Sequence, residues 1–110
     1  MTKPKQGTVP HHETEIAELR ADRDLAIEYL RAAMASLDTP EGRAGGLLAM
    51  RTIAEAYGGL SAVAAEAGIS RESLYRALSP KGNPTLNTLV AVLKVVGMRL
   101  SVEQETPAHA

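Results

Sequence analysis

Apolar residues recur at helical spacing along most of this chain. The first such stretch carries apolar residues every three or four positions: Ile27, Leu30, Met34 and Leu37. Charged residues fill the positions between them, as in an amphipathic helix, and we expect this helix over residues 13–38. Thr39 and Pro40 then have the residue types preferred at an N-cap and at the first helical position. They predict a second helix, which Gly58 and Gly59 end.

Three shorter helices are expected to follow, over residues 61–67, 71–78 and 86–96. Gly68 breaks the first of these, and Ser70 and Thr85 are suited to cap the other two. Residues 98–102 alternate between apolar and polar types, which predicts a short strand. Because a lone strand is unstable, this segment either pairs with its copy across a two-fold axis or extends as a tail.

The two short helices around Gly68 have the residue types of a helix-turn-helix unit. Ala64 is small where two such helices cross closely, and Gly68 can adopt the left-handed conformation that turns one helix across the other. Ile69, Leu74 and Leu78 are expected to anchor the second helix in the core. Two short helices joined at a glycine also occur in helical domains that never contact DNA, so the turn alone does not decide the function.

The second helix of this unit is expected to direct five residues outward: Arg71, Glu72, Ser73, Tyr75 and Arg76. In DNA-binding proteins of this type, the N-terminal residues of the second helix meet base edges in the major groove. Arg71 is suited to reading guanine, and Ser73 to bonding a base or a phosphate. Arg76 and Lys81 are suited to phosphates.

The predicted elements make an all-α fold of five helices with a short C-terminal strand. The chain divides into a disordered arm (1–12), an N-terminal helical extension (13–38), a helix-turn-helix domain (39–102) and a flexible tail (103–110). The start of the second helix is weakened by three glycines, each of which costs up to about 1 kcal/mol relative to alanine: Gly42, Gly45 and Gly46.

Composition limits the classes of function. Of the 110 residues, 45% are hydrophobic and only 3% are aromatic, which suits one domain with an aliphatic core. The chain has no cysteine, no signal peptide and no apolar run long enough to cross a bilayer, so we expect a cytoplasmic protein. We find no catalytic constellation and no phosphate-binding loop, so we expect neither an enzyme nor a cofactor. His11 and His12 lack a third ligand nearby, so we expect no metal site.

Charge is unevenly distributed, although the formal net charge is only −1. Between residues 70 and 82, three basic residues stand against one acid, Glu72. Between residues 11 and 31, six acids stand against three arginines. The first segment would attract a polyanion, and the second would repel one.

Residues 60–102, LSAVAAEAGISRESLYRALSPKGNPTLNTLVAVLKVVGMRLSV, resemble the helix-turn-helix domain of the lambda-repressor-like group. More narrowly, the motif GISRESLYRALSPKGNPTL and the ending LVAVLKVVGMRLSV resemble the addiction-module antidote proteins, a HigA-like branch of antitoxins. The upstream segment AIEYLRAAMASLDTPEGRAGGLLAMRTIAEAYGG is similar more loosely, notably in EYLRAA. The resemblance leaves out the arm before Glu13 and the tail after Val102.

The resemblance implies a five-helix lambda-repressor-like fold and two binding activities. Such proteins bind the operator DNA of their own operon as dimers, and they neutralise a RelE/HigB-like toxin, a ribosome-dependent endoribonuclease. Carried over onto this sequence, the DNA-binding residues are Ser70, Arg71, Glu72, Ser73, Arg76, Lys81 and Asn83.

The acidic N-terminal segment offers a surface for such a toxin. Proteins that cleave RNA tend to be basic because they hold phosphates, and Glu15, Glu18 and Asp22 would complement them. An acidic helix face that only contacts solvent is an equally good interpretation. Two other functions also stay open: a stand-alone, phage-like transcriptional regulator without a toxin, and a protein-interaction module without DNA affinity.

Overall fold

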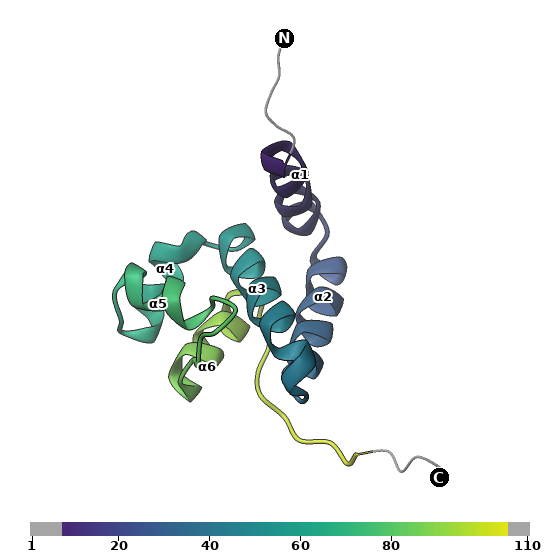
Figure 1. Ribbon diagram of the computed structural model, residues 1–110. Helices are drawn as coiled ribbons and strands as arrows, with labels where there is room; N and C mark the ends of the chain where they lie inside the picture. Colours follow the sequence, from purple (N-terminus) through teal and green to yellow (C-terminus); the bar gives the residue numbers. More distant parts are fainter. Residues whose placement is uncertain (1–7, 106–110) are drawn as a thin grey trace.

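The structure is a computed structural model and describes residues 8–105. This part of the chain folds into six α-helices and the segments that connect them (Figure 1). In chain order they are α1 (Thr8–Ala21), α2 (Arg23–Ser36), α3 (Pro40–Ala56), α4 (Gly59–Ala67), α5 (Arg71–Ala77) and α6 (Leu86–Val95). These residues contain no strand. The predicted all-α class is therefore confirmed, whereas the predicted count of five helices and the predicted C-terminal strand are wrong.

The additional helix arises at Asp22, which divides the helix predicted over residues 13–38. Asp22 has an extended backbone, with φ of −129° and ψ of 98°. Its side-chain Oδ1 accepts a hydrogen bond of 3.1 Å from the backbone N–H of Leu25. An aspartate in this conformation satisfies a donor that the first turn of a helix leaves free, so it ends α1 and starts α2.

The N-terminal end of the chain also differs from the predicted division. α1 begins at Thr8, inside the segment predicted as an arm, while residues 1–7 of that arm lie outside the described part. Residues 106–110 of the predicted tail lie outside it as well. Residues 98–102 are described but form no strand, because a strand needs a ladder partner and this segment has none within residues 8–105.

α3 lies at the centre of the fold, with α1 and α2 on one side and α4, α5 and α6 on the other (Figure 1). α1, α2, α4 and α6 all pack on α3, and α4 also packs on α5 and α6. Every helix contributes to one hydrophobic core, with fully or nearly fully buried side chains such as Leu19, Leu30, Met50, Val63, Leu74 and Val92. The N-terminal extension and the α4–α5 unit therefore share a single core.

Two arginines near the α1–α2 junction satisfy the C-terminal ends of distant helices. The Arg20 Nε donates to the carbonyl oxygen of Ala56 at 3.0 Å, at the end of α3. The Arg23 Nη2 donates to the carbonyl oxygen of Val96 at 2.7 Å, just after α6. The last carbonyls of a helix lack partners within it and carry partial negative charge, so both contacts are favourable. These two guanidiniums are therefore committed to holding the fold together.

The glycines at the start of α3 serve its contact with α2. A Cβ added at Gly46 would lie 2.6 Å from the carbonyl oxygen of Ala33, and one at Gly42 would lie 2.8 Å from that of Ser36. At Gly45, by contrast, an added Cβ would meet nothing within 4 Å. α3 is nevertheless one continuous helix. Gly42 and Gly46, which lie four residues apart on one helix face, let the two helix backbones approach closely.

Candidate nucleic-acid interface

α4 and α5 are joined by a turn that begins at Gly68. Gly68 has a left-handed φ of 74°, as its residue type predicted. The N–H of Gly68 donates to Ala65 at 3.1 Å, and the N–H of Ile69 donates to Ala64 at 3.0 Å. These bonds satisfy carbonyls at the end of α4. Ala64 is 2% exposed, as expected for a small residue at a close helix crossing.

Two features hold α5, which is too short at seven residues to be stable by itself. Ser70 caps it, because its Oγ accepts a 3.0 Å hydrogen bond from the backbone N–H of Ser73. The Ser70 hydroxyl also donates to the Ser73 Oγ at 3.0 Å. On the inner side, Leu74 and Leu78 are fully buried. Ser70 and Ser73, both expected to contact DNA, therefore also fix the start of the helix.

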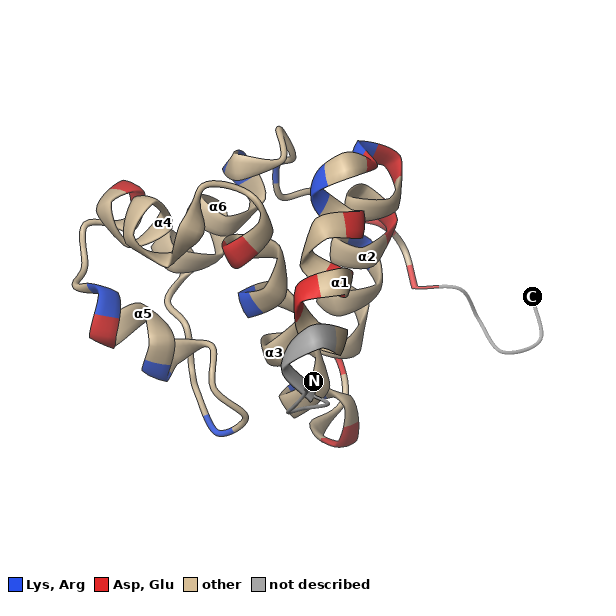
Figure 2. Cartoon of the chain, turned by 90° about the horizontal axis from the view of Figure 1, so that it is seen from above, with Lys and Arg blue, Asp and Glu red and all other residues tan. Residues whose placement is uncertain are grey.

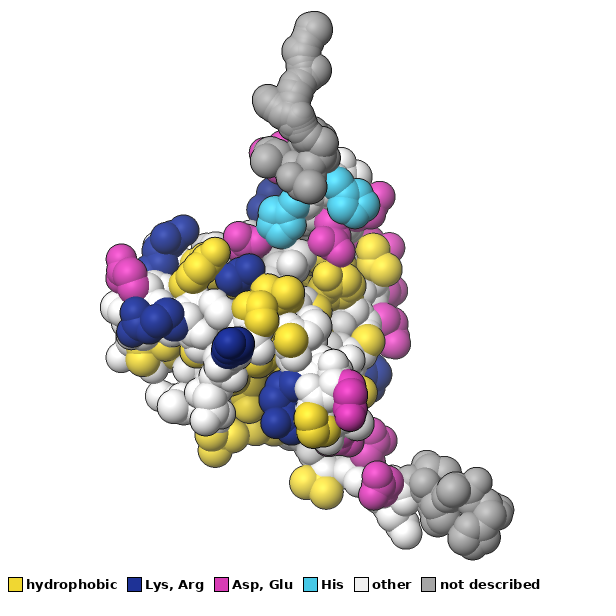
Figure 3. Space-filling view, in the orientation of Figure 1, with side chains coloured by type: hydrophobic (Ala, Val, Ile, Leu, Met, Phe, Trp, Pro, Cys, Tyr) yellow, Lys and Arg dark blue, Asp and Glu magenta, His cyan; other side chains and the backbone are white. Residues whose placement is uncertain are grey.

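The outer face of α5 is polar and open to solvent. Arg71, Glu72, Tyr75 and Arg76 are exposed, and they line a shallow hollow of about 370 Å³. The loop after α5 adds two exposed residues that were also expected in the site, Lys81 and Asn83. Figure 3 shows arginine and lysine side chains gathered over α5 and the neighbouring part of the molecule. The structure thus places the sequence-predicted residues on one exposed helix and the loop that follows it.

Arg51 of α3 belongs to this face although its position in the sequence did not indicate it. Its guanidinium Cζ lies 4.4 Å from the centre of the Tyr75 ring, within the range of a cation–π contact. Both residues line a second hollow of about 340 Å³, together with His12, Leu48, Thr52 and Glu55. No local pattern could have indicated this contact, because the two residues belong to helices that are separated in sequence by the whole of α4.

The acidic residues of the N-terminal segment lie on the other side of the molecule. Figure 2 shows α1 and α2, with several red positions, across α3 from the blue positions of α5. α5 and the loop after it carry Arg71, Arg76 and Lys81, against Glu72. The charge asymmetry found along the sequence is therefore also an asymmetry in space.

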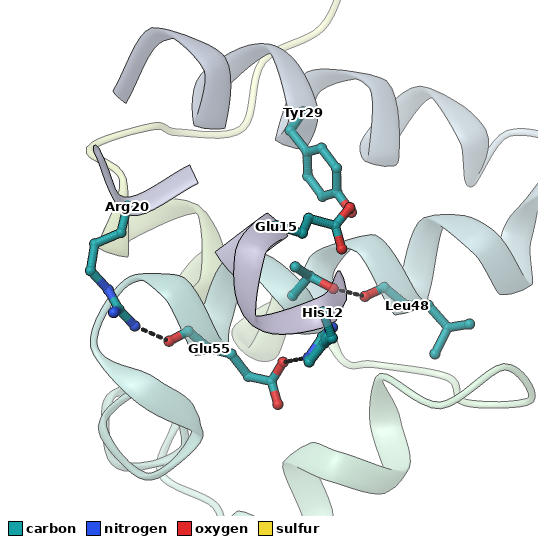
Figure 4. Close-up of polar contacts among 7 residues, drawn as sticks. His12, Glu15, Arg20, Tyr29, Leu48 and Glu55 are labelled. Atoms are coloured by element: carbon teal, nitrogen blue, oxygen red, sulfur yellow. Dashed lines mark hydrogen bonds and ion pairs between the residues drawn. The ribbon is translucent and has the colours of Figure 1, made fainter. Parts of the chain in front are cut away.

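The three acids expected to hold a toxin have different surroundings. Glu18 is exposed, whereas Asp22 is occupied as the N-cap of α2. Glu15 is half-buried, and its Oε2 accepts a 3.0 Å hydrogen bond from the Tyr29 hydroxyl (Figure 4). Burial, and then the hydrogen bond and charge of Glu15, raise the pKa of Tyr29 above its ordinary value of 10.0. Only Glu18 thus presents its carboxylate without such a contact.

His12, which was considered as a metal ligand, contacts an acid instead. Its Nε2 lies 2.9 Å from the Oε1 of Glu55 (Figure 4). Within residues 8–105, no three side chains of histidine, cysteine, aspartate or glutamate are grouped so that they could hold a metal. No helix in the described part is long and apolar enough to traverse a bilayer.

Comparisons with known proteins point to one family. The model of a family described as probable addiction module antidote protein matches residues 11–104. An uncharacterized protein of Haemophilus influenzae is 49% identical over 45 residues, which are 41% of this chain and 46% of that protein. The chain thus matches about half the length of this curated relative. No solved structure matches the chain.

Proposed function

The chain belongs to the family of probable addiction module antidote proteins, and on this premise we propose that it is a DNA-binding antitoxin of a type II toxin–antitoxin module. It binds operator DNA sequence-specifically, represses its own operon and neutralises a RelE/HigB-like toxin. The family itself implies a toxin partner in general, since an antidote acts against a toxin. DNA binding and the class of toxin are the further steps of the proposal.

The observation that carries the DNA-binding proposal is the exposed N-terminal half of α5. Arg71 is the first residue of this helix, and its guanidinium makes no hydrogen bond or ion pair within residues 8–105. The first residues of such a helix are those that reach base edges when it enters the major groove. A guanidinium with free donors in that position can bond both acceptors of a guanine.

We also propose that the protein acts as a homodimer. α5 has seven residues, so one copy reads too few base pairs for useful affinity. Two copies related by a two-fold axis read two half-sites about one helical turn of DNA apart, about 34–36 Å. An operator with an inverted repeat at this spacing is the DNA that such a dimer would select.

The Arg71→Ala variant should weaken operator binding by about 1–3 kcal/mol and relax the preference at one base pair of each half-site. The measurement is fluorescence anisotropy on the duplex from upstream of the gene and on duplexes with single base-pair changes. Arg31→Ala is the control, because Arg31 lies on α2 across α3 from α5, 3.6 Å from Glu28. An equal loss on all duplexes would make Arg71 a phosphate contact, and affinity that does not change with salt would reject DNA binding.

The proposed toxin surface is the acidic outer face of α1 and the α1–α2 junction. Glu18 presents a free carboxylate there, and a basic, RNA-cleaving toxin would complement this charge. The face lies across α3 from α5 (Figure 2), so one copy has separate surfaces for the toxin and for DNA.

Cells that express the small reading frame next to this gene should stop growing, and co-expression of this protein should restore growth.

Glu18→Lys should weaken toxin binding, measured by calorimetry, and leave DNA binding intact. Asp22→Asn tests the charge at the junction without removing the cap, because Asn caps a helix as well as Asp does. Glu103→Lys, an equal charge change outside α1 and α2, is the control.

Each outcome of the toxin experiment separates the hypotheses. If growth does not stop, the stand-alone regulator explains the DNA-facing helix better than an antitoxin does. If growth stops and recovers but Glu18→Lys binds the toxin as the unchanged protein does, the acidic face is a solvated surface and the toxin binds elsewhere.

A further inference from the structure

We propose that Arg51 and Tyr75 form a preassembled phosphate-binding pair, in which the Tyr75 ring positions the Arg51 guanidinium against the DNA backbone beside α5. This inference rests on the proposed DNA-binding function and adds a contact that comes from α3. It also changes the role of Tyr75. The sequence placed Tyr75 among the DNA-contacting residues, whereas here it positions a neighbouring arginine.

Arg51 differs from most other arginines of residues 8–105 in what its guanidinium contacts. Five arginines are engaged through their N–H groups, three with backbone carbonyls, one with a glutamate and one with a serine hydroxyl: Arg20, Arg23, Arg43, Arg31 and Arg76. Arg51 makes no hydrogen bond or ion pair in this part of the chain, and its contact is with the face of the Tyr75 ring. A contact with a ring face uses no hydrogen-bond acceptor, so it leaves the N–H groups of Arg51 without a partner among residues 8–105. The N–H groups of a guanidinium match a phosphate with two parallel hydrogen bonds.

Glu55, an acid in the same hollow as Arg51, is paired with a different residue. Glu55 lies four residues after Arg51 on α3, at the spacing that favours an ion pair on a helix surface. Its Oε1 instead lies 2.9 Å from His12 Nε2 of α1 (Figure 4). The hydroxyl of Thr52, in the same hollow, donates to the carbonyl oxygen of Leu48 at 3.2 Å. Glu55 and Thr52 thus have partners of their own, and among residues 8–105 no acid forms an ion pair with Arg51, which is available to an anion from outside.

The position of the pair suits a backbone contact. Tyr75 follows Arg71 by four residues on α5, so both lie on the same face of the helix. Tyr75 is 49% exposed and Arg51 is half-buried. When a helix enters the major groove, the phosphate backbones run along its two sides. Arg51, which reaches α5 from α3, therefore lies where a backbone strand would pass.

A stacked arginine also loses little freedom when it binds. Free arginine side chains carry about 2 kcal/mol of rotamer entropy, part of which is lost when they bind. The contact with the Tyr75 ring, whose centre lies 4.4 Å from the Arg51 Cζ, restricts the guanidinium before DNA arrives, which lowers this cost. Arg51→Lys keeps the charge but lacks the planar fork, so it separates the charge of Arg51 from its geometry.

The test measures DNA affinity against salt concentration for four single variants and one double variant of the full chain. The variants are Arg51→Ala, Arg51→Lys, Tyr75→Ala, Tyr75→Phe and Arg51→Ala/Tyr75→Ala. Two probes are used: the duplex from upstream of the gene and a random-sequence duplex of equal length. A contact to phosphate is independent of sequence, so the losses should be alike on both probes.

Arg51→Ala should weaken binding to both duplexes about tenfold, as expected for a hydrogen-bonded charge. The slope of log affinity against log salt should become less steep by about 0.9 for each phosphate that the variant no longer neutralises. Tyr75→Ala should lose a similar factor, and Tyr75→Phe, which keeps the ring, should recover most of it. Arg51→Lys should keep the slope and lose part of the affinity. The double variant should bind about as weakly as either alanine variant, because the two residues act as one unit.

Specific results would overturn the inference. Unchanged affinity and slope in both Arg51 variants would remove the arginine from the interface. Equal affinity of Tyr75→Ala and the unchanged protein would show that the ring does not position it, and relaxed sequence preference in Tyr75→Phe would make Tyr75 a base contact. Thermal melting of each variant identifies losses caused by unfolding, and Arg31→Ala is the control for charge. If the unchanged protein bound neither duplex in a salt-dependent way, the proposed function itself would fail.

Discussion

Leu74→Ala is expected to lower the free energy of unfolding by about 2–5 kcal/mol and to abolish DNA binding. Leu74 is 0% exposed and is the buried residue of α5. A helix of seven residues is not stable without tertiary contacts. Removing most of this side chain leaves a cavity under α5 and takes away one of its two leucine anchors, the other being Leu78. The exposed arginines would then lose the fixed positions that base reading needs.

The matched control is Leu86→Ala, the same chemical change at a leucine that is 65% exposed. Because little apolar surface is buried there, it should change stability by less than about 0.5 kcal/mol. Urea denaturation followed by circular dichroism measures both variants, and anisotropy at low temperature measures DNA binding by the fraction that stays folded. If folded Leu74→Ala bound DNA as tightly as Leu86→Ala does, α5 would not be the reading helix.

The features of the α4–α5 unit that the sequence predicted are those governed by local rules. Gly68 adopts the left-handed turn and Ser70 caps α5, as their residue types indicated. Both effects involve backbone groups only a few residues away, so a short window of sequence contains the cause. Leu74 and Leu78 were predicted as anchors for a similar reason, since their spacing places both on one helix face.

The break at Asp22 was missed because hydrophobic periodicity dominated the prediction. Residues 13–38 read as one amphipathic helix when only apolar spacing is followed. The cue was the residue type itself, an aspartate able to accept the N–H of Leu25, three residues later. Periodicity tells which residues are helical, but it does not tell whether the helix is continuous.

The sequence did not predict which side chains make contacts between distant segments. Arg20, Arg23 and Arg51 are all arginines on helices, and nothing near them in sequence separates their roles. Two of them bond the carbonyls that end other helices, while the third stacks on a tyrosine of α5. Tertiary packing assigns these roles, so only a structure distinguishes the two arginines that bond helix ends from the one whose N–H groups have no partner within residues 8–105.

The second large expected effect is on stability, at two neighbouring glycines of α3. Replacing Gly45 or Gly46 with alanine should change the free energy of unfolding in opposite directions. Gly46→Ala is expected to destabilise the protein by about 1–3 kcal/mol, the usual cost of overpacking. A Cβ there would lie 2.6 Å from the carbonyl oxygen of Ala33, so α2 and α3 would have to move apart. That displacement would disturb a contact between the central helix and the N-terminal extension.

Gly45→Ala should instead stabilise the protein, by up to about 1 kcal/mol. The new methyl group meets nothing within 4 Å, and alanine favours a helix interior over glycine. Urea denaturation measures the free energy of unfolding of both variants. The comparison is controlled, because both variants replace a glycine with alanine in the same helix. If both substitutions stabilised the protein, α2 could withdraw from α3 without cost, and the close approach of the two helices would not be needed for the fold. Opposite signs would establish that Gly46 is required by the packing of α2, even though local helix propensity disfavours it.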